Sequence, residues 1–248
     1  MYELLPQISD YPEFQNASLQ SQQVPPQFLK TAIFAGGSFR VLESAFGSIN
    51  GVNKTSTGYF GGSLRKPSYE EVSEGGTGHT EAVKVEYDSS IISFSSLCGL
   101  FWDIHDPTNK DYLNFGLSTH ERSVIFYSTE EERKEAQKSK IRKQMRLNKK
   151  IVTKILSREN CEFFLAENQY QKYYLQKYYK LCGSLGLRST VQFVESNIAC
   201  KLNGILGMIN EEQKLDELAI FLEIQELSNH AKLACEEIIE DLRELKEK

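Results

Sequence analysis

A short apolar run followed by two glycines and a serine most narrows what this chain can fold into. Residues 31–35 (Thr-Ala-Ile-Phe-Ala) are apolar enough for a buried strand and too short for a helix. Gly36 and Gly37 let the backbone turn sharply, and Ser38 is a residue type that caps helix N-termini. The pattern therefore predicts a strand, a tight turn and a helix from Ser38 to about Phe46.

Later segments predict further strands and helices in alternation. Residues 80–87 alternate apolar and polar side chains, which is typical of a half-buried strand. Ser93 begins an apolar helix, and Pro107 stops it. Two more strands and a charged helix are expected, at 124–127, 151–156 and 129–148 respectively. Two connections are too short for every pair of strands to be parallel. The sequence thus predicts an α+β domain, an α/β sandwich or roll with a mixed sheet, and a C-terminal helical extension.

The rest of the chain differs in character. Residues 50–78 are rich in Gly, Ser and Thr, so a long irregular segment is expected there. From Asn210 onward we expect two helices, broken near Ser228, that dock on the domain or on a protein partner. Their docking residues are expected to be Leu215, Leu218, Leu222, Leu233, Ile238 and Leu242. The expected division is an N-terminal arm (1–28), the α+β domain (29–175), a C-terminal extension (176–209) and a helical tail (210–248).

Composition narrows the function classes. The 248 residues include 29 Lys or Arg and 34 Asp or Glu, a net charge of −5 that argues against a nucleic-acid-binding protein. No run of about 18 apolar residues occurs, so we expect no membrane partner. The first residues carry no apolar signal region, so no secretory signal is expected. The cysteines are scattered and predict the reduced thiols of a cytoplasmic protein; they are Cys98, Cys161, Cys182, Cys200 and Cys235.

Charge is unevenly distributed along the chain. Residues 133–154 contain ten basic residues and one acidic residue, whereas residues 209–248 contain twelve acidic and five basic residues. The basic segment could bind RNA or an acidic surface. Alternatively, it is a solvated helix face, and the negative charge of the acidic tail balances its positive charge. No aromatic residue interleaves the basic ones, which favours the solvated face.

Eight short motifs follow one another in a fixed order. They lie at residues 32–39, 51–52, 58–62, 67–72, 78–83, 87–88, 101–108 and 122–123. Together they resemble peptide methionine sulfoxide reductase A, and the resemblance covers about residues 30–175. It implies the family's fold and reaction. In that reaction a cysteine thiolate attacks the sulfoxide sulfur of an oxidised methionine and becomes a sulfenic acid. Other cysteines resolve the sulfenic acid, and thioredoxin regenerates the enzyme. No cofactor is implied.

The resemblance assigns Ser38 to the position of the nucleophilic cysteine. A serine hydroxyl is a far weaker acid than a thiol and needs an adjacent base. Oxygen also cannot pass through the sulfenic acid and disulfide states. We therefore expect thiol-dependent reduction of methionine-S-sulfoxide to be weak or lost.

At the other site positions, some residues match those of the family and some differ. The resemblance implies that Glu81 protonates the sulfoxide oxygen, that Tyr69 assists it, and that Phe39 forms one wall of the methyl pocket. Three substrate-binding positions differ from the family's residues, namely Arg40 for tryptophan, Gly116 for aspartate and Glu121 for tyrosine. His79 and His105 lie in scaffold motifs, so we expect structural roles for both and no metal site.

Three functions fit these residues. The first, which we favour, is a binding or regulatory pseudoenzyme that keeps part of the pocket for methionine sulfoxide. The second is an active reductase that uses a relocated Cys182 or Cys200, with thioredoxin as its partner. The third is acid–base chemistry such as hydrolysis or isomerisation by Ser38, Glu81 and Tyr69. The pattern puts no histidine beside Ser38 to activate it, which argues against the third.

Overall fold

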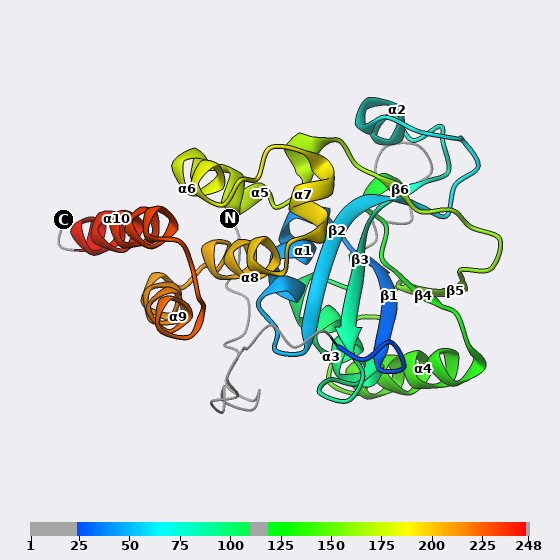
Figure 1. Ribbon diagram of the computed structural model, residues 1–248. Helices are drawn as coiled ribbons and strands as arrows, with labels where there is room; N and C mark the ends of the chain where they lie inside the picture. The colour runs from blue at the N-terminus through cyan, green and yellow to red at the C-terminus, as the bar shows by residue number, and fades with distance from the viewer. Residues whose placement is uncertain (1–23, 110–118, 247–248) are drawn as a thin grey trace.

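A six-stranded mixed sheet forms the centre of the protein. The computed structural model describes residues 24–109 and 119–246, so Gly116 and most of the expected N-terminal arm lie outside the described residues (Figure 1). The strand order is β5-β4-β1-β3-β2-β6. Only β4 and β5 run parallel among these neighbours. The strands are β1 (Leu29–Ala35), β2 (Val52–Phe60), β3 (Thr80–Asp88), β4 (Val124–Tyr127), β5 (Lys154–Ser157) and β6 (Phe164–Leu165).

Helices pack on this sheet and extend beyond it toward the C-terminus (Figure 1). The first four are α1 (Phe39–Gly47), α2 (Tyr69–Ser73), α3 (Phe94–Ile104) and α4 (Glu130–Gln144). The C-terminal ones are α5 (Tyr173–Gln176), α6 (Tyr179–Ser184), α7 (Thr190–Glu195), α8 (Asn197–Leu206), α9 (Glu211–Ile224) and α10 (Asn229–Lys246). Two single turns are η2 (Thr119–Glu121) and η3 (Asn168–Tyr170). The predicted α+β class with a mixed sheet and C-terminal helices is confirmed.

The prediction of an irregular segment over residues 50–78 is wrong, because this segment contains β2 and α2. Strand β2 lies between β3 and β6, and its polar residues Thr55 and Thr57 are buried. Their hydroxyls find partners inside the protein: Thr57 Oγ1 donates to the Tyr170 carbonyl at 3.2 Å, and Thr55 Oγ1 donates to Glu43 at 3.3 Å. The strand was missed because the buried side chains in its middle, Thr55, Ser56 and Thr57, are polar.

Two smaller expectations also need correction. The predicted strand over 151–156 is shorter and begins only at Lys154, and β6 was not expected. Ser38 does occupy the N-cap position of α1, but its side chain accepts no capping hydrogen bond.

A buried ion pair links α1, β2 and the start of the C-terminal helices. Lys172 Nζ donates to Glu43 Oε1 and to the Thr55 carbonyl, both at 2.7 Å, and the Lys172 backbone N–H donates to Glu43 Oε2 at 2.8 Å. Both side chains are fully buried. Because Lys172 directly precedes α5, the ion pair fixes where the C-terminal helices leave the sheet.

The C-terminal helices have an apolar core of their own, the second core, which is separate from the first core between the sheet and helices α1 and α3. It runs from Leu175 in α5 to Leu242 in α10, and α9 and α10 contribute Leu218, Phe221, Cys235 and other buried residues to it. Leu215 and Leu222 pack against the same core. Leu233 was expected to pack there too, but it is 58% exposed because it lies on the outer face of α10.

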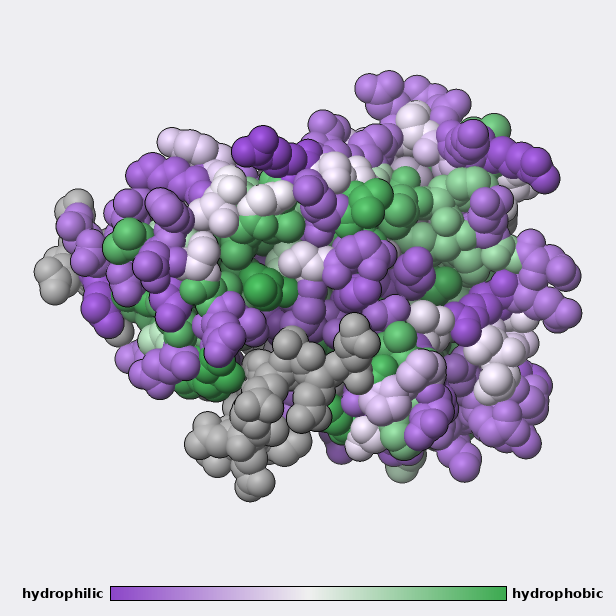
Figure 2. Space-filling model, in the orientation of Figure 1, coloured by the Kyte–Doolittle hydropathy of each residue, from purple (hydrophilic) through white to green (hydrophobic). Residues whose placement is uncertain are grey.

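The acidic tail does not neutralise the basic helix, contrary to one interpretation of the sequence. Figure 1 shows α4 on the side of the molecule opposite to α9 and α10. Hydrophilic residues cover most of the face in Figure 2, with smaller apolar areas over the sheet and the C-terminal helices. Within the part of the chain that the structure describes, no helix is long and apolar enough to cross a membrane.

Two leucines of the tail test the second core. Leu218→Ala should lower the free energy of unfolding by about 2–5 kcal/mol, because Leu218 is fully buried and the smaller side chain leaves a cavity. Leu233→Ala should change it by no more than about 0.5 kcal/mol, because Leu233 is largely exposed. Urea unfolding followed by circular dichroism measures both. Equal losses in the two variants would contradict the packing of α9.

Candidate active site

The turn between β1 and α1 brings a helix N-terminus to a buried carboxylate. Gly37 has a φ of 71°, which glycine adopts without strain, and Ser38 follows at the first position of the turn into α1. The Phe39 backbone N–H donates to Glu81 Oε2 at 2.9 Å. Glu81 comes from the start of β3 and is 2% exposed. Ser38 and Phe39 therefore meet Glu81, which lies 42 residues after Phe39, in one site.

Burial tunes the acid chemistry of Glu81. It raises the pKa of the carboxyl to about 7, and the negative charge of Glu121 contributes in the same direction. The hydrogen bond from Phe39 N–H and the positive charge of Arg40 act the opposite way and lower this pKa. A carboxyl that titrates near neutral pH can donate a proton to a bound oxygen and take it back.

Three tyrosine rings surround Phe39, whose backbone N–H binds this carboxylate. The Phe39 ring centroid lies 6.1 Å from that of Tyr59, 6.2 Å from that of Tyr69 and 5.6 Å from that of Tyr170. Glu167 fixes two of the tyrosines, because it accepts from Tyr59 Oη at 2.6 Å and from the Tyr69 backbone N–H at 2.8 Å. Burial raises the pKa of Tyr69, so its hydroxyl stays protonated at neutral pH.

Arg40 changes the character of this aromatic wall. Its guanidinium carbon lies 5.2 Å from the Tyr170 ring centroid and 4.6 Å from that of Tyr173, distances typical of cation–π contacts. Its Nε is buried and has no hydrogen-bond partner. The site therefore carries a positive charge where the resemblance implies a flat apolar side chain.

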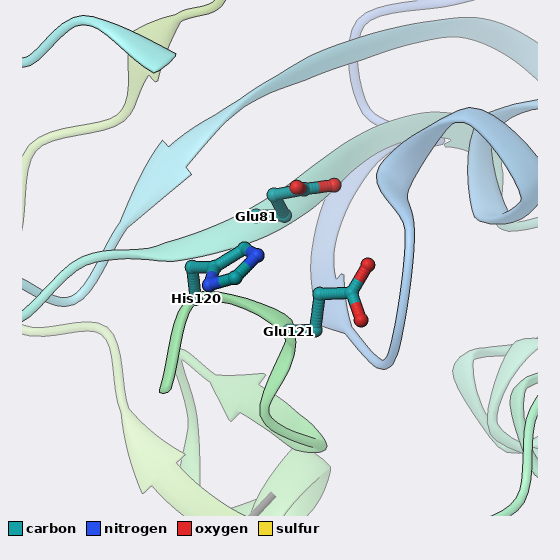
Figure 3. A group of neighbouring side chains, drawn as sticks. All are labelled: Glu81, His120 and Glu121. Carbon is teal, nitrogen blue, oxygen red and sulfur yellow. The ribbon is translucent and has the colours of Figure 1, made fainter. Parts of the chain in front are cut away.

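The η2 turn adds two more polar side chains opposite Glu81. Figure 3 shows His120 and Glu121 directed toward the space beside the Glu81 carboxylate. One ligand atom from each of the three residues lies within 4.8 Å of the others. Glu121 was expected in the site, whereas His120 was not, and the only signal for it in the sequence is its position next to Glu121.

The cysteines considered as replacements for the missing thiol lie elsewhere. Cys200 packs against Gly47, at the C-terminal end of α1, whereas Ser38 is at the N-terminal end. A nine-residue helix is about 14 Å long. Cys182 donates from Sγ to the Leu175 carbonyl in the second core, and burial raises the pKa of its thiol to about 11. Neither thiol lies beside Glu81.

The two scaffold histidines are engaged at both ring nitrogens. His79 Nδ1 accepts from the Gly62 backbone N–H at 3.1 Å, which leaves Nε2 to donate to the Leu64 carbonyl at 2.8 Å. The ring nitrogens of His105 contact the Phe101 carbonyl and Ser123 Oγ at 2.8 and 2.7 Å. Burial lowers the pKa of His105 to about 4, so its ring is neutral.

Comparison with known proteins identifies the family. The sequence model described as "Peptide methionine sulfoxide reductase" matches residues 30–202, well over half of the chain. The chain belongs to the peptide methionine sulfoxide reductase family. It is similar to the MsrA of Methanococcus maripaludis, with 41% identity over 148 residues, 60% of this chain and 93% of that protein. The MsrA of Pasteurella multocida is 41% identical over 145 residues, 58% of this chain and 82% of that protein.

Solved structures of the family have the same fold. Yeast (Saccharomyces cerevisiae) Mxr1 in its reduced form matches with a TM-score of 0.56 and 28% identity, over 62% of this chain and 88% of that one. Methionine sulfoxide reductase A of Corynebacterium diphtheriae matches with a TM-score of 0.54 and 27% identity, over 61% of this chain and 76% of that one. The match to the family's sequence model ends at residue 202, so it also includes part of α8.

The raised pKa of Glu81 predicts a pH-dependent stability. The pKa is about 7 in the folded protein and 4.5 when unperturbed, so the folded state favours the protonated carboxyl. This contribution is fully present below pH 4.5 and is lost as the pH rises through 7. Relative to Glu81→Gln, which stays uncharged, the native protein should lose about 3 kcal/mol of unfolding free energy between these values. Urea unfolding at several pH values measures it. Parallel pH profiles of the two proteins would contradict the raised pKa.

Proposed function

We propose that this member of the family has lost the thiol-dependent reduction of methionine-S-sulfoxide and acts as a binding or regulatory pseudoenzyme. One observation carries the proposal: Ser38 occupies the turn into α1 beside Glu81, where the family's reaction needs a cysteine. The serine oxygen cannot be oxidised to a sulfenic acid or form a disulfide. The family's reaction therefore lacks the sulfur atom that attacks the sulfoxide.

The retained groups support binding of a sulfoxide side chain. Glu81 is half protonated near neutral pH and can donate a hydrogen bond to a sulfoxide oxygen. The partly exposed rings of Tyr69 and Tyr170 offer apolar surface for a methyl group, and the fully buried Phe39 packs against both of them. The ligand that this chemistry favours is a methionine sulfoxide side chain of a peptide or protein.

The position of the cysteines supports the loss of reduction. Cys200 lies at the far end of α1 from Ser38, and Cys182 is held in the second core with a raised pKa. A thiol with a pKa of about 11 provides little thiolate at neutral pH. Thioredoxin is a partner only if reduction is kept. We also propose a cytoplasmic location, which the five free cysteines support.

Reduction of a peptide that contains methionine-S-sulfoxide, followed by mass spectrometry with excess dithiol, tests this function. The native chain should show no turnover above the dithiol background. Ser38→Cys combined with Arg40→Trp should gain turnover, because it restores the sulfur and the flat pocket wall. Adding Glu81→Gln to that double variant should lower the gained rate by about 10²–10⁴-fold, the contribution expected of a general acid.

Other results contradict parts of the proposal. Native turnover that Cys182→Ser or Cys200→Ser abolishes would establish a relocated nucleophile. If no variant turns over and calorimetry detects no binding of the sulfoxide peptide to the native chain, the pocket itself has been lost.

A further inference from the structure

We infer that Glu81, His120 and Glu121 form a binding site for a divalent transition-metal ion of the zinc type. One ligand atom of each residue lies within 4.8 Å of the others, and Figure 3 shows the three side chains converging from β3 and η2. This site uses residues of the sulfoxide pocket for a different ligand. The inference does not depend on whether reduction has been lost, because metal binding is measured without turnover.

The ring of His120 differs from the rings of His79 and His105 in its hydrogen bonding. Its Nδ1 is buried and has no hydrogen-bond partner. Both ring nitrogens of His79 and His105 have partners, so those rings serve the scaffold. The His120 ring makes no hydrogen bond among the described residues, so its nitrogen beside the two carboxylates is available to a metal ion.

The backbone around η2 is held rigidly, as a metal site requires. The Gly37 N–H donates to the Glu121 carbonyl at 2.9 Å, and Thr80 Oγ1 donates to the His120 carbonyl at 2.7 Å. The Arg122 guanidinium donates to the carbonyls of Gly78 and His79 at 2.8 and 2.9 Å. These bonds fix η2 against β1 and β3, and so they hold His120 and Glu121 beside Glu81.

The charges of the cluster also favour a cation. The carboxylate oxygens of Glu81 and Glu121 lie within 4.8 Å of each other, so their negative charges repel. The nearby guanidinium of Arg40 is directed over Tyr170 and Tyr173 and bonds neither carboxylate among the described contacts. The Phe39 N–H occupies Oε2 of Glu81 and leaves Oε1 available. A divalent ion would relieve the repulsion between the carboxylates.

The donor set indicates the class of ion. One imidazole nitrogen and two carboxylate oxygens suit zinc, manganese or iron better than magnesium or calcium, which prefer oxygen alone. Zinc binds such donors at about 2.0–2.2 Å, and three protein ligands leave a position for water or another ligand. The inferred site is therefore open toward the pocket.

Titration with Co²⁺, a spectroscopic substitute for zinc, tests the site in the full-length reduced protein. Cys161→Ser serves as the background, because Cys161 is the exposed cysteine and the other four are buried. We expect one equivalent of Co²⁺ to give visible absorption bands of nitrogen and oxygen ligation, without the near-ultraviolet band of a cobalt–thiolate bond. His120→Gln and Glu121→Gln should each weaken binding at least tenfold. His230→Gln, on the exposed face of α10, should leave it unchanged.

Three outcomes would overturn the site. They are no cobalt binding at millimolar concentration, equal affinity in the native protein and both site variants, or a thiolate band that moves the ligands to cysteine. Thermal unfolding without metal shows whether each variant is folded. If Glu121→Gln does not fold, Glu121→Tyr takes its place, because it has the residue that the family uses. Failure of cobalt binding leaves the sulfoxide-peptide assay unaffected, so the two proposals fail separately.

Discussion

The ion pair between Glu43 and Lys172 is the interaction on which the two halves of the structure depend. It joins α1 and β2, which border the first apolar core, to the beginning of the helices that form the second core. Each charge is fully buried, so removing one partner would leave an uncompensated charge at a cost of about 3–5 kcal/mol. The three hydrogen bonds that Lys172 donates, two to Glu43 and one to the Thr55 carbonyl, offset the desolvation of both groups. The same contact holds α1 in the orientation that aims its N-terminus at Glu81.

The site then follows from the position of α1. Because the Phe39 N–H at the first turn donates to Glu81, the helix N-terminus and the start of β3 are held at hydrogen-bond distance. The Phe39 side chain fills the space between Tyr59, Tyr69 and Tyr170, and Glu167 holds two of these rings. The carboxylate is thereby buried, and burial is the main reason that its pKa rises to about 7. Packing thus produces the acid chemistry of the site.

The sequence predicted the parts of the fold and site that local patterns encode. Alternation found β3, apolar character found β1, and the ordered motifs brought Ser38, Phe39 and Glu81 into one site. Strand β2 was missed because Thr55 and Thr57 look like loop residues until the partners of their hydroxyls, up to 113 positions away, are known. His120 was missed for the same reason, since only the fold brings it to Glu81. Leu233 has the right spacing, but helical spacing does not show which side of α10 faces a neighbour.

The departures from the family's residues act on one carboxyl and are best understood together. Arg40 and Glu121 bring opposite charges to the pocket, and their effects on the pKa of Glu81 oppose each other. Burial has the largest effect on this pKa and outweighs the hydrogen bond from Phe39, so Glu81 remains an acid that titrates near neutral pH. A single exchange of cysteine for serine in an otherwise intact reductase would have left an apolar methyl pocket. Arg40 and Glu121 instead bring charges beside Glu81, so the pocket differs from an apolar methyl pocket in more than the missing sulfur.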